Sequence, residues 1–87
     1  MSARNDAIRT IYAQVDAPRW AAANLDGLTD VLRDLSWLPE GPVLITLPDL
    51  GGLPATDRAA LLHVVGEAAA ASLDSARPVR ISRVAQP

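Results

Sequence analysis

The stretch Asn24–Leu38, which reads NLDGLTDVLRDLSWL, decides the fold of this chain. Its apolar residues recur at the three- and four-residue spacing that places side chains on one side of a helix. Asn24 is a favourable N-cap residue, so the helix is predicted to start there and to end before Pro39. The apolar stripe that should face the core consists of Leu25, Leu28, Val31, Leu32 and Leu35.

Two carboxylates, Asp26 and Asp30, fall on the side of this helix opposite the apolar stripe. Their four-residue spacing makes them neighbours on one face, where like charges cost a few tenths of a kcal/mol. The helix dipole favours Asp26 by about 0.3–1 kcal/mol, so folding alone does not decide for or against the pair. They are either an ordinary solvated face or a site for a cationic partner. An acid–base catalytic pair is disfavoured, because an exposed helix face offers no pocket to shift their pKa values.

Two further helices are expected. Asn5 is predicted to cap a first helix that ends near Ala17, where Pro18 follows. Thr56 is predicted to cap a longer helix that runs to about Leu73.

Two segments read as strands. Val43–Leu47 is a continuous apolar run bounded by prolines, which is typical of a buried strand in a parallel sheet. Val79–Val84 alternates apolar and polar residues and should form the last strand. The order helix, helix, strand, helix, strand predicts an α/β fold in which about three helices cover a small parallel sheet.

Composition limits the function. The chain has 87 residues and is expected to form one domain, residues 1–87, in a reducing, cytoplasmic setting, because it has no cysteine and no membrane-spanning run. Seven acids and two arginines between Asn24 and Glu67 give that segment a net charge of −5, which disfavours nucleic acid and favours basic proteins. His63 stands alone, and Gly51-Gly52 lacks the lysine of a P-loop, so no metal, cofactor or enzymatic activity is expected.

Residues 24–30 and 34–38, NLDGLTD and DLSWL, resemble the barstar family of intracellular ribonuclease inhibitors and its bacterial members. The family pattern joins an aromatic–Gly loop, Asn-Leu/Trp-Asp-Ala-Leu, a second Asp and often Asp-Leu-Ser-Trp-Leu. The resemblance covers roughly residues 8–84. It implies a two-layer α/β fold and inhibition by mimicry, in which a helix and the preceding loop fill a nuclease active site and carboxylates stand in for RNA phosphates.

The resemblance also implies roles for particular residues. Asp30 would be the central acid and Asp26 its neighbour, while Asn24 would organise the loop and the helix start. The remaining partner-binding positions that it implies, in the loop, on the helix, at the helix end and on the later helix, are Trp20, Ala22, Thr29, Trp37 and Glu67. Trp20 and Trp37 could equally be core anchors, and Glu67 could be an ordinary solubilising residue.

Three departures from the family pattern bear on the predicted site. Ala22 stands where the family usually has glycine, which predicts a different backbone shape in the loop. Thr29 replaces a frequent tryptophan and removes apolar contact area. The first family strand is missing, so one edge of Val43–Leu47 should lack a pairing strand from this chain. We expect a second copy, a partner or upstream residues to cover that edge.

Two functions from different classes follow. The first is an immunity protein that inhibits a basic ribonuclease or toxin nuclease in the producing cell. The alternative is a barstar-related structural or regulatory module that binds another partner, or forms a homodimer, through the open strand edge.

Overall fold

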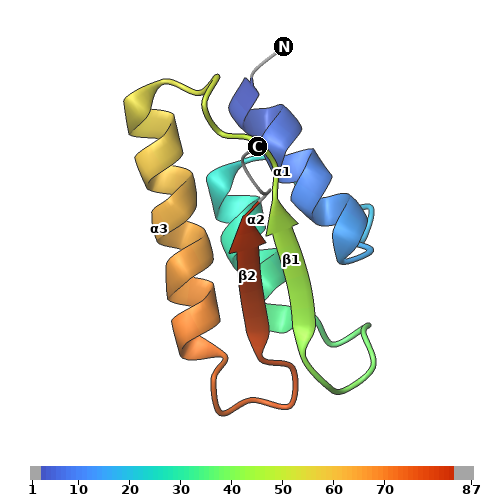
Figure 1. The fold of residues 1–87 in the computed structure, drawn as a ribbon. Helices are drawn as coiled ribbons and strands as arrows, with labels where there is room; N and C mark the ends of the chain where they lie inside the picture. The colour runs from blue at the N-terminus through green and yellow to red at the C-terminus, as the bar shows by residue number, and fades with distance from the viewer. Residues whose placement is uncertain (1–2, 84–87) are drawn as a thin grey trace.

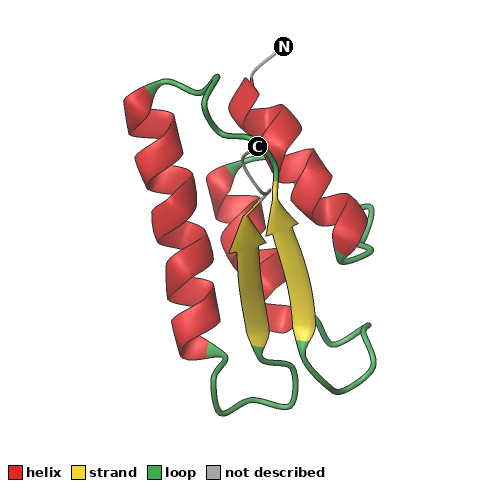
Figure 2. Cartoon of the chain, viewed as in Figure 1, coloured by secondary structure: helices red, strands yellow, loops and turns green. Residues whose placement is uncertain are grey.

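The chain folds as two helices, a strand, a third helix and a second strand. In the structure, a computed structural model that describes residues 3–83, these elements are α1 (Ala3–Gln14), α2 (Leu25–Asp34), β1 (Val43–Leu47), α3 (Ala55–Ala71) and β2 (Val79–Arg83). The strands pair in parallel, with Val43 opposite Val79. Figures 1 and 2 show α2 behind the strands, α1 along the β1 side and α3 along the β2 side. The predicted α/β fold, a small parallel sheet covered by three helices, is confirmed.

The core lies between one face of the sheet and the helices. Burying each Leu, Ile or Val side chain contributes about 1.5–3 kcal/mol relative to leaving it exposed. The predicted stripe of α2 supplies much of this core, although Leu25 is only partly buried. The largest fully buried side chains come from the three helices, β1 and the loops between them, and are Ile8, Ile11, Val15, Leu28, Val31, Leu35, Ile45, Leu47, Leu61 and Val65.

Two predicted helix caps are wrong. α1 already includes Ala3, so Asn5 lies inside its first turn. α3 begins at Ala55 after Pro54, which makes no side-chain cap bond, and Thr56 is the second helical residue. Pro54, at the N-cap position, has no side-chain acceptor, so α3 starts without a side-chain cap. α1 stops at Gln14 rather than near Ala17 because Asp16 adopts a positive φ of 51°.

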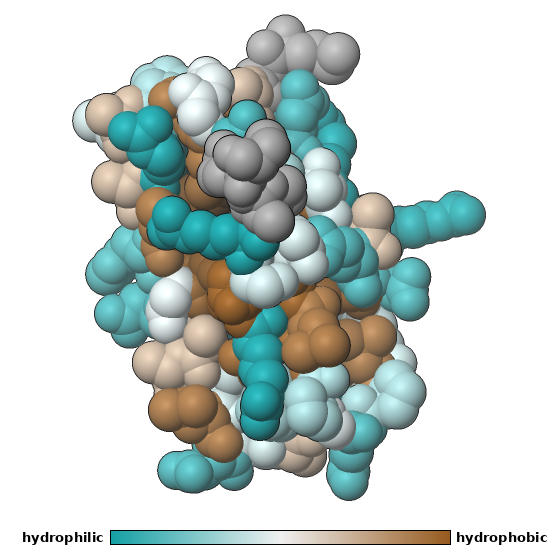
Figure 3. Space-filling view, viewed as in Figure 1, coloured by the Kyte–Doolittle hydropathy of each residue, from teal (hydrophilic) through white to brown (hydrophobic). Residues whose placement is uncertain are grey.

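β1 is buried on one face only, which corrects the prediction of a fully buried strand. Val43, Ile45 and Leu47 point into the core, whereas Leu44 is 70% exposed. The helices cover a single face of the sheet, so alternate residues of each strand meet solvent. Figure 3 shows this open face, where polar side chains and apolar surface lie side by side. Val84, predicted as the last residue of the second strand, lies outside the described residues.

The outer edge of β1 is less open than the sequence suggested. The Val43 N–H donates to the Pro78 carbonyl at 2.8 Å, and in a parallel pair alternate residues direct their backbone groups toward the partner strand. Leu44 and Thr46 therefore direct their N–H and C=O groups away from β2. Gln14 meets both groups of Thr46. Its Nε2 donates to the Thr46 carbonyl at 2.8 Å, and the Thr46 N–H donates to its Oε1 at 2.8 Å. The amide thus replaces one peptide unit of a neighbouring strand.

We expect Gln14→Ala to lower the free energy of unfolding by about 1 kcal/mol, the net value of a typical hydrogen bond or two at a partly exposed site. The Thr46 amide should also exchange its hydrogen faster, because its acceptor is gone. Denaturant titration and hydrogen exchange measure these effects. Gln14→Glu is the control, since its carboxylate keeps an acceptor for the Thr46 N–H. An unchanged exchange rate at Thr46 in Gln14→Ala would show that the amide does not protect this edge.

Candidate functional site

The outer face of α2 presents two free carboxylates. Asp26 and Asp30 are both exposed, and neither takes part in the ion pairs formed among residues 3–83. Arg33, on the same helix, lies beside the groove toward α3 and pairs with neither acid. The two aspartates are therefore available to a cation from outside the chain.

The helix start is fixed as predicted. The Asn24 side chain accepts a hydrogen bond from the Gly27 N–H at 2.7 Å, which satisfies one of the free donors of the first turn. The Leu28 N–H donates to the Asn24 carbonyl at 2.9 Å. Asn24 thus sets the direction in which the loop enters α2 and in which Asp26 is displayed.

A contact between the loop and α2 depends on Gly27. The Ala22 carbonyl lies so close to Gly27 that a Cβ there would sit 2.1 Å from its oxygen. Tyr12, on α1, donates from its hydroxyl to the same carbonyl at 2.6 Å. Burial, and to a smaller extent the nearby Asp30 carboxylate, raises the pKa of the Tyr12 phenol above its ordinary value, at which the phenol is already protonated at neutral pH, so the hydroxyl is a donor there. The loop is therefore held by α1 on one side and by α2 on the other.

Two tryptophans lie together beside this loop. The Trp20 and Trp37 rings meet edge to face, with centroids 6.5 Å apart and planes at 90°. Trp37 is partly buried and donates from Nε1 to the Val15 carbonyl at 2.8 Å, whereas Trp20 is 62% exposed. Trp37 therefore anchors the pair to the fold, and Trp20 is presented to solvent.

Thr29 and Glu67 line one groove between α2 and α3. Its volume is about 350 Å³, and Arg33 and His63 also line it. Thr29 donates to the Leu25 carbonyl of its own helix at 3.0 Å. Glu67 lies 4.0 Å from His63 Nε2, and both side chains are exposed. The structure thus places Thr29 and Glu67 on the lining of the same groove.

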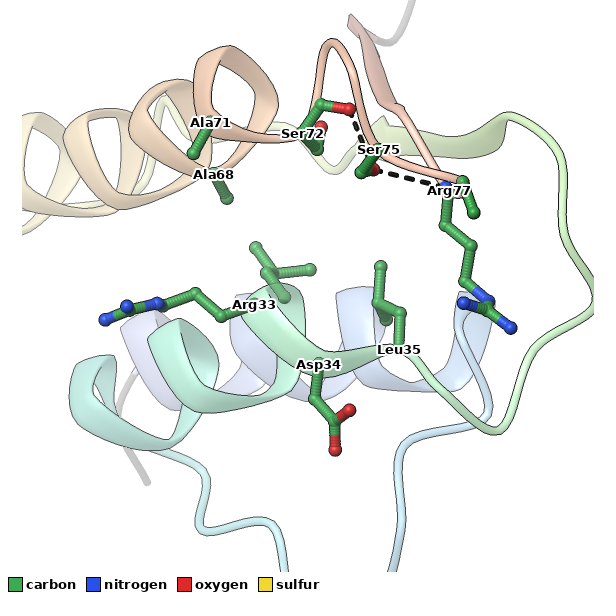
Figure 4. A pocket seen from close by; sticks show the side chains of 10 residues that line it. Arg33, Asp34, Leu35, Ala68, Ala71, Ser72, Ser75 and Arg77 are labelled. Carbon is green, nitrogen blue, oxygen red and sulfur yellow. Dashed lines mark hydrogen bonds between the residues drawn. The ribbon is translucent and has the colours of Figure 1, made fainter.

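A second cavity, of about 260 Å³, lies between the C-terminal ends of α2 and α3 (Figure 4). The serine hydroxyl groups that line it already form hydrogen bonds with nearby backbone groups. Ser72 Oγ donates to the Ala69 carbonyl and accepts the Val79 N–H, and Ser75 Oγ donates to the Ser72 carbonyl at 2.8 Å. In Figure 4 the Asp34 carboxylate points away from this space. The cavity therefore brings no nucleophile and base together.

Other chemistry has no visible site in the described part of the chain. No group of three His, Cys, Asp or Glu side chains within residues 3–83 is arranged to hold a metal ion. Over the same range, no helix combines the length and apolarity needed to cross a membrane.

Sequence reasoning missed Tyr12 and Gly27. A signal for Gly27 was present, because it stands where the family pattern has alanine, just as Ala22 stands where the pattern has glycine. The two departures are complementary, since the glycine on the helix makes room for the carbonyl of the alanine in the loop. Nothing in the spacing of Tyr12 indicated that its hydroxyl would reach a carbonyl ten residues away.

The fold and this surface define a small α/β domain with an acidic helix face and a fixed loop before it. The chain belongs to the barstar family: residues 1–83 match the family described as Barstar (barnase inhibitor). The resemblance seen in the α2 sequence is thus confirmed over nearly the whole chain. A search of curated proteins and a search of solved structures each found no match.

Proposed function

We propose that this protein is an immunity protein that inhibits a basic ribonuclease or toxin nuclease in the cytoplasm of the bacterium that produces it, without doing chemistry itself. Membership of a family of barnase inhibitors supports the class of activity. The observation that carries the proposal is the pair of exposed aspartates on α2, which have no cationic partner within residues 3–83.

The chemistry of the target explains why such a pair should bind. A ribonuclease holds a polyanion with Arg, Lys and His side chains, so its empty active site is cationic. A carboxylate held by a helix can accept bidentate, charge-assisted hydrogen bonds from an arginine fork. Asp26 and Asp30 would then occupy positions that RNA phosphates take in the substrate complex. Complementary fields should also raise the association rate by roughly 10–10³-fold at low salt.

The proposed contact surface extends from the two aspartates to the residues around them. We assign the centre to Asp30, with Asp26 beside it and with Asn24 and Ala22 fixing the loop. Trp20 supplies exposed aromatic area, while Trp37 holds it in place. The groove on the α3 side adds the other two predicted positions, Thr29 and Glu67.

The two tight contacts at the loop support a preorganised site. Because Tyr12 and Gly27 hold the Ala22 carbonyl, the loop has little conformational freedom to lose when it binds. Thr29 offers less apolar area than the tryptophan of the family pattern, so more of the affinity should come from charge than from packing.

The alternative, a regulatory module or homodimer that uses the outer edge of β1, has less support. Gln14 already occupies both groups of Thr46 at that edge. Only Leu44 retains outward backbone groups without a partner among residues 3–83. Gln14 therefore covers one of the two residues of β1 whose backbone groups face outward at this edge.

The test is protection of RNA. The purified protein is titrated into barnase and a panel of other basic ribonucleases, and cleavage of a fluorogenic RNA is followed at low and high salt. We expect stoichiometric inhibition of at least one enzyme, with an association rate that falls as salt rises.

The control is a second double variant that has the same net charge as the variant expected to lose inhibition. Asp26→Asn/Asp30→Asn should lose inhibition, whereas Asp34→Asn/Asp74→Asn, which removes two exposed carboxylates elsewhere, should retain it. Equal inhibition by both double variants, or no inhibition of any enzyme by the wild type, would contradict the proposal.

A further inference from the structure

The two outer edges of the sheet differ in how far their backbone groups are hydrogen-bonded. At β1, Gln14 closes the edge at Thr46. At β2, Val79, Ile81 and Arg83 direct their backbone groups away from β1, because the parallel register alternates. The Val79 N–H donates to Ser72 Oγ at 2.8 Å. Ile81, at the middle of the strand, has no partner for its outward N–H and C=O among residues 3–83.

An apolar trough runs beside this open edge. Two cavities of about 420 and 200 Å³ share Leu47, Leu62 and Arg83, so they adjoin one another along this edge. α3 forms the wall opposite β2, with Leu62, Val65, Gly66 and Ala69. Figure 3 shows apolar surface in this region, between the strands and α3. An unpaired strand edge and an apolar wall therefore face the same space.

Gly66 leaves part of this wall without a side chain. Glycine inside a helix is less stable than alanine, so it calls for a reason. A Cβ at Gly66 would meet no atom within 4 Å, so no neighbour in the described structure requires its absence. The missing side chain flattens α3 beside the trough, which leaves room for a second backbone.

The charges at one end of the trough favour an acidic occupant. Arg58 and Arg83 line that end, and neither forms an ion pair within residues 3–83. Asp49 lines the same end, but its Oδ1 already accepts the Gly51 N–H at 2.9 Å. Arg80, exposed on the open face of the sheet, adds a further positive charge near the strand.

We propose that β2 accepts a third strand from a partner protein, an extended segment whose apolar side chains fill the trough and whose acidic residues reach Arg58 and Arg83. Main-chain hydrogen bonds to Ile81 would supply affinity, and the trough and the arginines would select the sequence, as in other cases of strand addition. This surface uses no residue of α2. The protein could therefore hold a nuclease on the acidic face and a second partner on β2.

The experiment uses two defined peptides, because the direction of the added strand is not fixed by the open edge. Each has three Thr-Val repeats, with two aspartates at its N-terminal end in one peptide and at its C-terminal end in the other. We expect one of them to slow hydrogen exchange at the Ile81 amide at least tenfold at saturation. The same peptide with lysines in place of the aspartates should bind at least tenfold more weakly.

Matched variants of α3 test the location. Gly66→Leu fills the trough and should abolish the protection of Ile81, whereas Ala70→Leu, an exposed position of the same helix that does not line the trough, should leave it unchanged. Protection that survives Gly66→Leu, or no protection by either peptide up to about 1 mM, would overturn the proposal. Protection that rises with protein concentration alone would also overturn it, in favour of a second copy of the chain. No readout involves a nuclease, so failure here leaves the inhibitor proposal untouched.

Discussion

Replacing Asp30 with alanine should weaken the complex with the target ribonuclease by about 2–5 kcal/mol, or roughly 30-fold to several thousand-fold in Kd. The reason is that Asp30 is assigned to the centre of the contact, where its removal leaves a cation of the enzyme buried without a partner. Folding should be almost unaffected, since Asp30 is exposed and forms no ion pair within the described residues. Relief of its repulsion from Asp26 should even add a few tenths of a kcal/mol.

Isothermal titration calorimetry against the inhibited enzyme, together with denaturant unfolding of the free protein, separates these two effects. Asp34→Ala is the matched control, because Asp34 lies one turn further along α2, is exposed and has no ion pair within residues 3–83. Its Kd should stay within about threefold of the wild type, which is under 1 kcal/mol. If Asp30→Ala and Asp34→Ala bind equally well, the acidic face of α2 does not carry the interaction.

The largest effect on the fold itself is expected from Gly27→Ala. The new Cβ would lie 2.1 Å from the Ala22 oxygen and 3.0 Å from the Tyr12 hydroxyl, so the loop backbone must move. Overpacking of this kind costs about 1–3 kcal/mol, and a displaced carbonyl loses the phenol that now binds it, at about 1–3 kcal/mol more. The higher helix propensity of alanine offsets about 1 kcal/mol of this loss in the free energy of unfolding. We therefore expect a net loss of about 2–3 kcal/mol, which would lower Tm by roughly 10–20 °C in a domain of this size.

The same substitution at Gly66 is the internal control. A Cβ there meets nothing within 4 Å, so Gly66→Ala should stabilise α3 by about 0.5–1 kcal/mol. Tyr12→Phe should fall between the two, with a loss of about 1 kcal/mol, because it removes only the hydrogen bond to Ala22. Thermal unfolding followed by circular dichroism ranks the three variants. A Gly27→Ala protein as stable as the wild type would mean that the loop can shift away from α2 at little cost.

The features that sequence alone predicted well are local ones. The stripe of α2 and its Asn24 cap depend on spacing and on the chemistry of a few consecutive residues, and both are present in the structure. The strand order follows from short apolar runs separated by a helix, and the parallel pairing is observed. The exposure of Asp26 and Asp30 follows in the same way from their position opposite the stripe.

The features that sequence did not predict depend on residues far apart in the chain. Leu44 is apolar but exposed, because only one face of the sheet is covered. Gln14 reads as an ordinary polar residue at the end of a helix, and only the packing of α1 beside β1 brings its amide to Thr46, 32 positions away. Asn5 and Thr56 are good caps by chemistry, yet the helices begin before them.

By itself, the sequence determined the elements of this protein and the side of α2 on which its two carboxylates lie, since helical periodicity requires only neighbours along the chain. The tertiary structure decided how the loop before α2 is held, through Tyr12 and Gly27, and which edge of the sheet is left open. The physical reason is that steric contact and hydrogen bonding act between whatever groups the fold brings within a few ångströms, and sequence separation does not limit which groups those are.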